Sequence, residues 1–176
     1  MKYWYVAAAA GDEQLTAAIR DCVEQASGIA TREMPLADVE FAFDAVRGQY
    51  SSIAVLEMLA RDCPADAAKL LGVTERDLFI PVLTFVFGQA QLKGRVAVIS
   101  LARLRQEFYG LPPDREILME RACKEALHEA GHTLGLVHCA DRECAMSLST
   151  NVRQIDTKRA AYCEACRAHL RNGERQ

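Results

Sequence analysis

Three of the four histidines in the chain fall between positions 128 and 138. His128 and His132 are four residues apart, so on an α-helix their imidazoles lie on one face and can bind a single metal ion. Glu129 follows the first histidine, where its carboxylate can hold a water molecule on that metal without being a ligand. These residue types at this spacing predict a helix-borne metal site that carries out hydrolysis.

Gly135 and His138 extend the pattern. The glycine comes where the helix must end and the chain must turn, and glycine tolerates the positive φ that such helix ends commonly need. The turn can bring His138 back to the metal as a third ligand. Three histidines on a tetrahedral Zn²⁺ leave one position for water, which is the arrangement of a catalytic site rather than a structural one. The alternative, that the histidines are ordinary core or surface residues, is disfavoured by the fixed offsets.

The run His-Glu-x-x-His-x-x-Gly-x-x-His is the long zinc motif of the metzincin peptidases, which also have a methionine turn downstream. Met146 follows His138 by eight residues and is the candidate for that turn. In other proteins a lone methionine is most often a core residue. Both interpretations of Met146 stay open at this point.

Four cysteines follow the third histidine, namely Cys139, Cys144, Cys163 and Cys166. The last two form Cys-x-x-Cys, a spacing that lets two thiolates bind one metal ion. Four thiolates would make a closed tetrahedral zinc site, which can only stabilise, and residues 139–166 contain few large apolar side chains to order them otherwise. Two alternatives remain: disulfides in a secreted protein, or a redox pair at the Cys-x-x-Cys.

Together these motifs resemble those of the archaemetzincins, a branch of the metzincin metallopeptidases. The resemblance covers most of the chain, and its zinc and cysteine motifs are specific. One departure is the length of the loop between Met146 and Cys163, which is about one residue shorter than expected and should not disturb the ligands. The matching segments are the zinc motif with Cys139, Cys144-x-Met146, Cys163-x-x-Cys166, and upstream 44–50 (DAVRGQY), 85–88 (FVFG) and 105–110 (RQEFYG).

The resemblance implies a zinc-dependent peptidase in which Glu129 is the general base. It implies two Zn²⁺ ions per chain, one catalytic and one structural, with Met146 beneath the catalytic ion. It also implies an α+β fold of the metzincin-like zincin type: a mixed twisted sheet, an active-site helix and a small zinc-stapled C-terminal subdomain. The implied ligands are His128, His132 and His138 for the catalytic zinc, and Cys139, Cys144, Cys163 and Cys166 for the structural zinc.

The length of 176 residues suits a single metallopeptidase domain, 1–176. We expect an N-terminal lobe, 1–134, that includes the active-site helix, and a C-terminal lobe, 135–176. The net charge of −3 argues against a nucleic-acid partner, and no apolar run approaches the ~20 residues that cross a bilayer. The cysteines are seven, an odd number, and four of them have metal-type spacing, which fits a reducing compartment. We therefore expect a cytoplasmic monomer that acts on a peptide or protein substrate.

The first ten residues allow two interpretations, a short signal peptide or a first strand. The strand is favoured because aromatic and β-branched residues begin it and Gly11-Asp12 ends it. Further along, Thr84–Gln89 is the candidate for an edge strand that pairs with an extended substrate, the alternative being an interior strand. The predicted strands are Tyr3–Ala9, Ile29–Met34, Leu78–Pro81, Thr84–Phe87 and Val96–Ser100, and the predicted helices are Asp12–Ser27, Ser51–Arg61 and Arg115–Leu134.

Several other side chains are predicted to stabilise the fold and to take no part in the chemistry. Ile53 and the other apolar residues of the second helix are expected in the core, and the resemblance makes Arg47 and Tyr50 a structural tether. The remaining cysteines, Cys22, Cys63 and Cys123, are expected to be small buried residues.

A different class of function competes with peptide hydrolysis. The same ligands would serve a zinc-stabilised binding or regulatory domain with little proteolytic turnover, because ligand geometry alone does not guarantee an accessible cleft.

Overall fold

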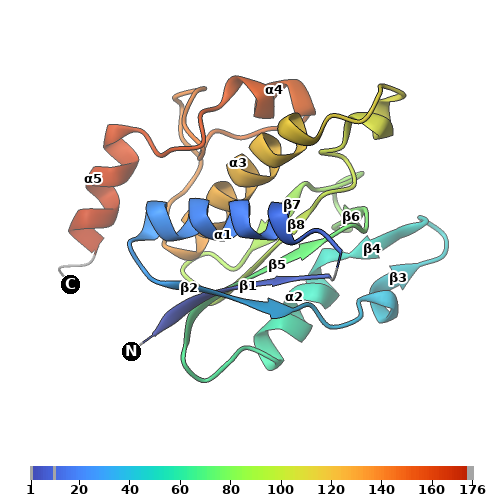
Figure 1. Cartoon of the computed structure of the whole chain (residues 1–176), viewed down its shortest axis with the longest axis horizontal. Coiled ribbons are helices and arrows are strands. Elements are labelled where there is room, and N and C mark those ends of the chain that lie inside the picture. The colour runs from blue at the N-terminus through green and yellow to red at the C-terminus, as the bar shows by residue number, and fades with distance from the viewer. Residues whose placement is uncertain (1, 10, 174–176) are drawn as a thin grey trace.

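A five-stranded mixed sheet forms the centre of the molecule, in the strand order β2-β1-β5-β8-β7 (Figure 1). The structure is a computed structural model that describes residues 2–9 and 11–173. The first four strands of that order run parallel, and β7 pairs antiparallel with β8 at one edge. The strands are β1 (Tyr3–Ala8), β2 (Thr31–Pro35), β5 (Ala67–Thr74), β7 (Gly88–Ala90) and β8 (Val96–Ser100); β3 (Phe43–Asp44), β4 (Gln49–Ser51) and β6 (Leu78–Phe79) form a second, three-stranded sheet.

Helices α1 and α3 cover one face of the large sheet, and α2 covers the other (Figure 1). The segment after α3 carries two shorter helices, and α5 extends away from the sheet at one end of the molecule. The helices are α1 (Glu13–Ser27), α2 (Ser52–Arg61), α3 (Arg115–Thr133), α4 (Val152–Thr157) and α5 (Glu164–Gly173), with short 3₁₀ turns at Glu40–Ala42 and Gln106–Tyr109.

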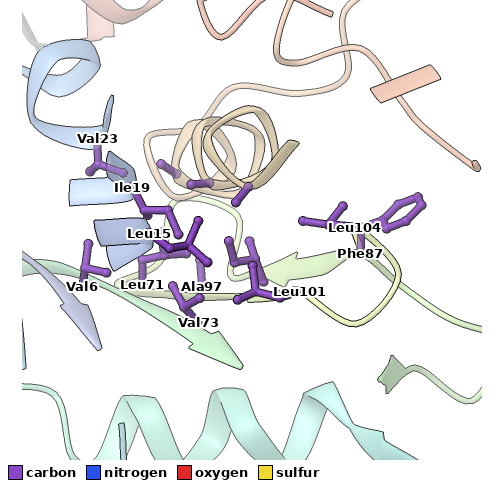
Figure 2. Close-up of a cluster of buried hydrophobic side chains, with 14 of the residues drawn as sticks. Val6, Leu15, Ile19, Val23, Leu71, Val73, Phe87, Ala97, Leu101 and Leu104 are labelled. Carbon is purple, nitrogen blue, oxygen red and sulfur yellow. The ribbon is translucent and has the colours of Figure 1, made fainter. Parts of the chain in front are cut away.

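Helix α1 follows the sequence prediction closely. The Asp12 carboxylate caps it by accepting a hydrogen bond from the Leu15 amide at 2.9 Å, and Gly28 ends it in the left-handed region. Leu15, Ile19 and Val23 recur at four-residue spacing and are buried against the sheet and α3 (Figure 2). This apolar contact fixes α1 beside the helix that carries the histidines.

The N-terminal segment is a strand, as predicted. β1 lies between β2 and β5 and pairs with both, so it is an interior part of the sheet. It ends at Ala8, one residue before the predicted boundary. Within residues 2–9 and 11–173, no helix is both long enough and apolar enough to cross a membrane.

The central strand β5 was missed by the sequence analysis. It pairs with β1 on one side and β8 on the other, and most of its residues are buried. Lys69 obscures the pattern, because a lysine near the middle of an apolar segment is uncommon in a buried strand. Its ammonium is accommodated by donating to the carbonyls of Gly94 and Thr133, at 2.6 and 2.7 Å.

The predicted strand Thr84–Phe87 is wrong. Only Val86 makes a bridge there, to Leu78, and the continuous strand begins at Gly88. The turn before it is held by the Arg47 guanidinium, which donates to the carbonyls of Leu83 and Pro81. Arg47 therefore acts as the expected tether, while the candidate edge strand is displaced toward the C-terminus, to Gly88–Ala90.

Two further predictions need adjustment. The strand Leu78–Pro81 is shorter than predicted and belongs to the second sheet, because β6 ends at Phe79 and the chain then turns at Pro81. Ile53, expected in the core, is 41% exposed, whereas the larger apolar residues that follow it in α2 are buried, namely Val55, Leu56, Met58 and Leu59. The division into lobes at residue 134 stays a prediction.

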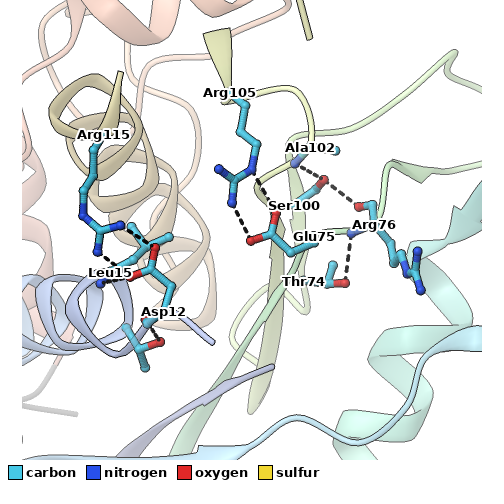
Figure 3. A network of polar contacts seen from close by, with 10 residues as sticks. Asp12, Leu15, Thr74, Glu75, Arg76, Ser100, Ala102, Arg105 and Arg115 are labelled. Carbon is cyan, nitrogen blue, oxygen red and sulfur yellow. Dashed lines mark hydrogen bonds and ion pairs between the residues drawn. The ribbon is translucent and has the colours of Figure 1, made fainter. Parts of the chain in front are cut away.

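Polar contacts join the N-terminal ends of α1 and α3 (Figure 3). Asp114 caps α3 by accepting from the Ile117 amide at 3.0 Å. The neighbouring Arg115 donates to both carboxylate oxygens of Asp12, the cap of α1, at 2.6 and 3.1 Å. One carboxylate thus caps its own helix and pairs with the next, so the start of the histidine-bearing helix is fixed to α1.

Candidate metal centres and active-site cleft

The last turns of α3 bring His128 and His132 together, as their spacing predicts. Their Nε2 atoms are 3.1 Å apart. The ring of His138 lies 5.3 Å from that of His128 and 5.0 Å from that of His132, measured between ring centres. One nitrogen of each residue fits within a group whose atoms are all within 4.8 Å of one another.

The turn after α3 is what returns His138 to the helix. Gly135 adopts φ of +96°, a conformation that a side chain at this position would strain. Its amide donates to the carbonyl of His132 at 3.0 Å, which closes the helix end. The glycine therefore has the role that the sequence assigned to it.

Hydrogen bonds to backbone carbonyls determine which ring nitrogen of His128 and of His132 is free to bind a metal ion. Nδ1 of His128 lies 2.8 Å from the Ala145 carbonyl oxygen, and Nδ1 of His132 lies 2.9 Å from that of Leu136. A carbonyl only accepts, so both Nδ1 atoms carry the hydrogen and both Nε2 atoms present a lone pair. Two lone pairs facing each other repel unless a cation lies between them.

The histidine cluster fits a tetrahedral zinc ion. Ligand nitrogens at the usual Zn–N length are about 3.3 Å apart, close to the separation of the two Nε2 atoms. Burial lowers the pKa of His128 well below its ordinary value and also lowers the pKa of His132 and of His138. All three rings are therefore held in the neutral form that binds metal.

Glu129 lies beside the histidines in the same cleft. Its side chain is buried and packs so tightly against β7 that a Cβ placed on Gly88 would be 2.7 Å from its Cγ. Burial raises the pKa of the Glu129 carboxyl well above its ordinary value, and the carboxylate of Glu125, one helical turn away, raises it further. The sequence motif alone gave no reason for the glycine at position 88.

The cleft has a volume of about 570 Å³ and is open at one side. Its walls are the segment 80–92, the inner face of α3, and residues 148–150. Large apolar side chains are exposed along its rim: Leu83 is 50% exposed, Val137 64% and Leu148 55%. The histidines and Glu129 are thus reached through a groove with apolar edges.

Met146 lies directly under the histidine-bearing helix and is fully buried. A Cβ placed on Gly131 would overlap its Sδ and would lie 3.3 Å from the ring of Tyr162. The close approach of the methionine to α3 is therefore possible only because position 131 lacks a side chain.

We expect Gly131→Ala to lower the free energy of unfolding by a net of up to about 2 kcal/mol. Alanine favours a helix by about 1 kcal/mol over glycine, but overpacking against a fully buried side chain costs about 1–3 kcal/mol. Urea unfolding followed by circular dichroism measures the change. Glu120→Ala, at an exposed position of the same helix, is the control. A Gly131→Ala protein at least as stable as the parent would contradict the close packing of Met146 against position 131.

The four C-terminal cysteines form a second cluster. Sγ of Cys139 is 3.7 Å from that of Cys163, and Sγ of Cys144 is 3.8 Å from that of Cys166. Four sulfurs at the usual Zn–S length would be about 3.8 Å apart, so the spacing fits a tetrahedral ion and is far too long for disulfides. The amides of Met146 and Cys163 also donate to the Cys144 sulfur, as they would to a thiolate.

Two buried charges beside the histidines were missed by the sequence analysis. Glu125 is buried in α3 and lines the cleft, and Lys158, 3% exposed, reaches it from the chain after α4. The Lys158 ammonium lies 3.4 Å from the Glu125 carboxylate and 3.5 Å from Nδ1 of His128. Glu125 precedes Glu129 by one helical turn, a signal that could have placed it at the site. Nothing local in the sequence marks Lys158.

A histidine triad beside a buried carboxylate, at a helix end that opens into a cleft, is typical of zinc-dependent hydrolases of the metzincin type. The sequence model of Peptidase family M54 matches residues 30–172, and the chain belongs to this family. The protein is a zinc metallopeptidase, and peptides or proteins are its substrate class. The competing hypothesis of a binding domain with little turnover is not favoured.

Relatives of known name support the same conclusion. An archaemetzincin of Methanocaldococcus jannaschii is 46% identical over 140 residues, which are 79% of this chain and 76% of that protein. The crystal structure of archaemetzincin from Methanopyrus kandleri matches with a TM-score of 0.87 at 36% identity, covering 99% of this chain and 96% of that one. A structure from Archaeoglobus fulgidus, complexed with malonate, matches with a TM-score of 0.81 at 33% identity, covering 96% of this chain and 99% of that one.

Proposed function

We propose that the histidine triad holds the catalytic zinc of this peptidase and that the cysteine cluster holds a second, structural zinc. The observation that carries the proposal is the pair of Nε2 lone pairs facing each other at 3.1 Å beside the buried Glu129. The closed set of four sulfurs leaves no position for substrate, whereas the three imidazoles leave one.

Glu129 is the general base in this proposal. When bound, zinc supplies a Lewis acid that lowers the pKa of a water molecule and polarises the carbonyl of the scissile peptide bond. Glu129 takes the proton from the attacking water and then delivers it to the leaving amine. Burial raises the pKa of this carboxyl, which makes the carboxylate a stronger base toward the proton of the water.

The free edge of β7 is our candidate for binding the substrate backbone. Phe87 accepts from the Ser100 amide and the Gln91 amide donates to Val96, so the hydrogen-bonded pairs along β7 are those at odd positions. In an antiparallel ladder the residues between them, Gly88 and Ala90, direct their backbone groups away from the partner strand. An extended peptide pairing there would lie along the cleft that contains Glu129.

We also propose that the protein works as a monomer in the cytoplasm. The location is supported by the 3.7–3.8 Å sulfur separations in the cysteine cluster, which fit free thiolates of the kind that a reducing compartment preserves.

Metal analysis tests the two-zinc proposal. We expect elemental analysis of the purified protein to give two zinc ions per chain, and Cys144→Ser to lower the value to one while weakening the order of residues 139–166. Cys63→Ser, outside both clusters, is the control and should keep both ions. A parent protein with a single zinc, or a Cys144→Ser variant that keeps two, would contradict the structural site.

Peptide cleavage tests the catalytic site separately. Hydrolysis of a mixed peptide library should require zinc, stop with a chelator and return when zinc is restored. If cleavage persisted after complete removal of the metal, the proposed role of the triad would be wrong.

A further inference from the structure

Two cysteines outside both metal clusters face each other across helices α1 and α3. Cys22 and Cys123 are 101 residues apart in the sequence, yet their sulfurs are 2.7 Å apart. Both are free thiols in the structure. Closing them to a disulfide shortens the separation of the sulfurs by only about 0.7 Å.

This separation differs in kind from that of the zinc-type cluster. The sulfurs of Cys139, Cys144, Cys163 and Cys166 keep the 3.7–3.8 Å that ligands around one ion require. At 2.7 Å, Cys22 and Cys123 are too close to be two ligands of a tetrahedral ion. This short separation instead suits two thiols that can form a disulfide with each other.

The two sulfurs differ in access. Cys22 is half-buried and lines a cavity of about 800 Å³ between α1, α5 and the C-terminal end of α3. Cys123 is buried behind it, with its sulfur 3.5 Å from the Ala18 carbonyl oxygen. A reagent entering the cavity therefore meets Cys22 first, and Cys123 lies next to the Cys22 sulfur.

The cavity is also electrically selective. The charged side chains among its described lining residues are those of Lys69, Lys93, Arg167 and Arg171. Arg167 and Arg171 both pair with Glu164, so the positive charge that favours an anionic molecule comes mainly from Lys69 and Lys93. The volume is in the usual range for a small-molecule site.

We propose that Cys22 and Cys123 form a thiol–disulfide exchange site that takes an anionic small-molecule disulfide from this cavity. The Cys22 thiolate attacks one sulfur of the small disulfide, forming a mixed disulfide and releasing the first small thiol. The Cys123 thiolate then attacks the Cys22 sulfur, releasing the second small thiol and closing the Cys22–Cys123 bond. The small disulfide takes up the two electrons that the protein thiols lose, and the two thiol protons leave with the products.

The electrostatics of the pair support this order. The hydrogen-bond contact with Cys123 lowers the pKa of Cys22, and the same contact raises the pKa of Cys123. The thiolate is the nucleophile, so Cys22 is the attacking group and Cys123 the resolving one.

The resulting bond would tie α1 to the helix that carries the histidines, five residues before His128. Closing a loop of about 100 residues restricts the unfolded chain, so the oxidised protein should melt roughly 5–10 °C higher than the reduced one. The exchange does not depend on the peptidase chemistry.

The test is incubation of the zinc-loaded protein with glutathione disulfide, followed by intact mass, peptide mapping and zinc content. We expect the parent to lose the mass of two hydrogens, to link the Cys22 and Cys123 peptides, and to retain its zinc. Cys123→Ser should stop at the first step and gain one glutathione on Cys22. Cys22→Ser should leave Cys123 unmodified, and Cys63→Ser should behave as the parent does.

The proposal is overturned if the parent keeps both thiols while Cys63 becomes modified, or if Cys123 reacts equally well without Cys22. The measurement on the parent needs no substitution, so the test stands even if a serine variant fails to fold. Cys22→Ala and Cys123→Ala repeat the two variant arms without placing a hydroxyl in the helix interface.

Discussion

Glu129→Gln is expected to lower kcat/KM for peptide hydrolysis by about 10²–10⁴-fold, the range that general acid–base catalysis contributes. The amide has nearly the shape of the carboxyl, so the packing of residue 129 against β7 should survive. It cannot accept the proton from water, and it cannot return one to the leaving amine. Zinc content and the melting temperature should therefore stay close to those of the parent, while steady-state hydrolysis of a fluorogenic peptide falls.

Glu120→Gln is the matched control for this experiment. It makes the same chemical change on the same helix, but the side chain is 72% exposed and pairs with Lys124 at the surface. Its activity should equal that of the parent. A Glu129→Gln protein that cleaves peptides as fast as Glu120→Gln would remove Glu129 from the mechanism and leave the metal ligands untouched.

The histidine site could be predicted because its geometry is local. His128, Glu129 and His132 sit within one helix whose pitch alone determines where their side chains point. Gly135 adds a turn whose φ only glycine adopts readily, and His138 follows within that same turn. The cysteine cluster was predictable for a similar reason, since the Cys-x-x-Cys spacing by itself indicates two thiolates that can bind one metal ion.

The parts that were missed depend on contacts between distant segments. β5 was not predicted because Lys69 interrupts its apolar pattern. The two backbone carbonyls that accept from the Lys69 ammonium belong to distant segments, so no local pattern indicates them. The misplaced edge strand has the same origin, since Arg47, more than thirty residues earlier, donates to carbonyls of the turn that precedes β7. Lys158 is the clearest case, because a lysine in a polar C-terminal segment normally faces solvent.

The burial of Lys158 leads to the prediction with the largest expected effect on stability. Lys158→Met should lower the free energy of unfolding by about 3–5 kcal/mol, because it leaves the Glu125 carboxylate buried and without its cationic partner. The melting temperature should fall by roughly 10 °C in calorimetry. Lys124→Met is the matched control. The Lys124 ammonium pairs with the exposed Glu120, so its loss leaves no buried carboxylate without a partner.

A double variant separates the ion pair from simple packing. Glu125→Gln/Lys158→Met removes both charges, so it should recover much of the stability lost in Lys158→Met alone. If the double variant were as unstable as the sum of the two single variants, the two side chains would be acting independently. The loss in Lys158→Met would then come from its contacts with α3 rather than from a stranded carboxylate, and Glu125 would need another partner to explain its burial beside Glu129.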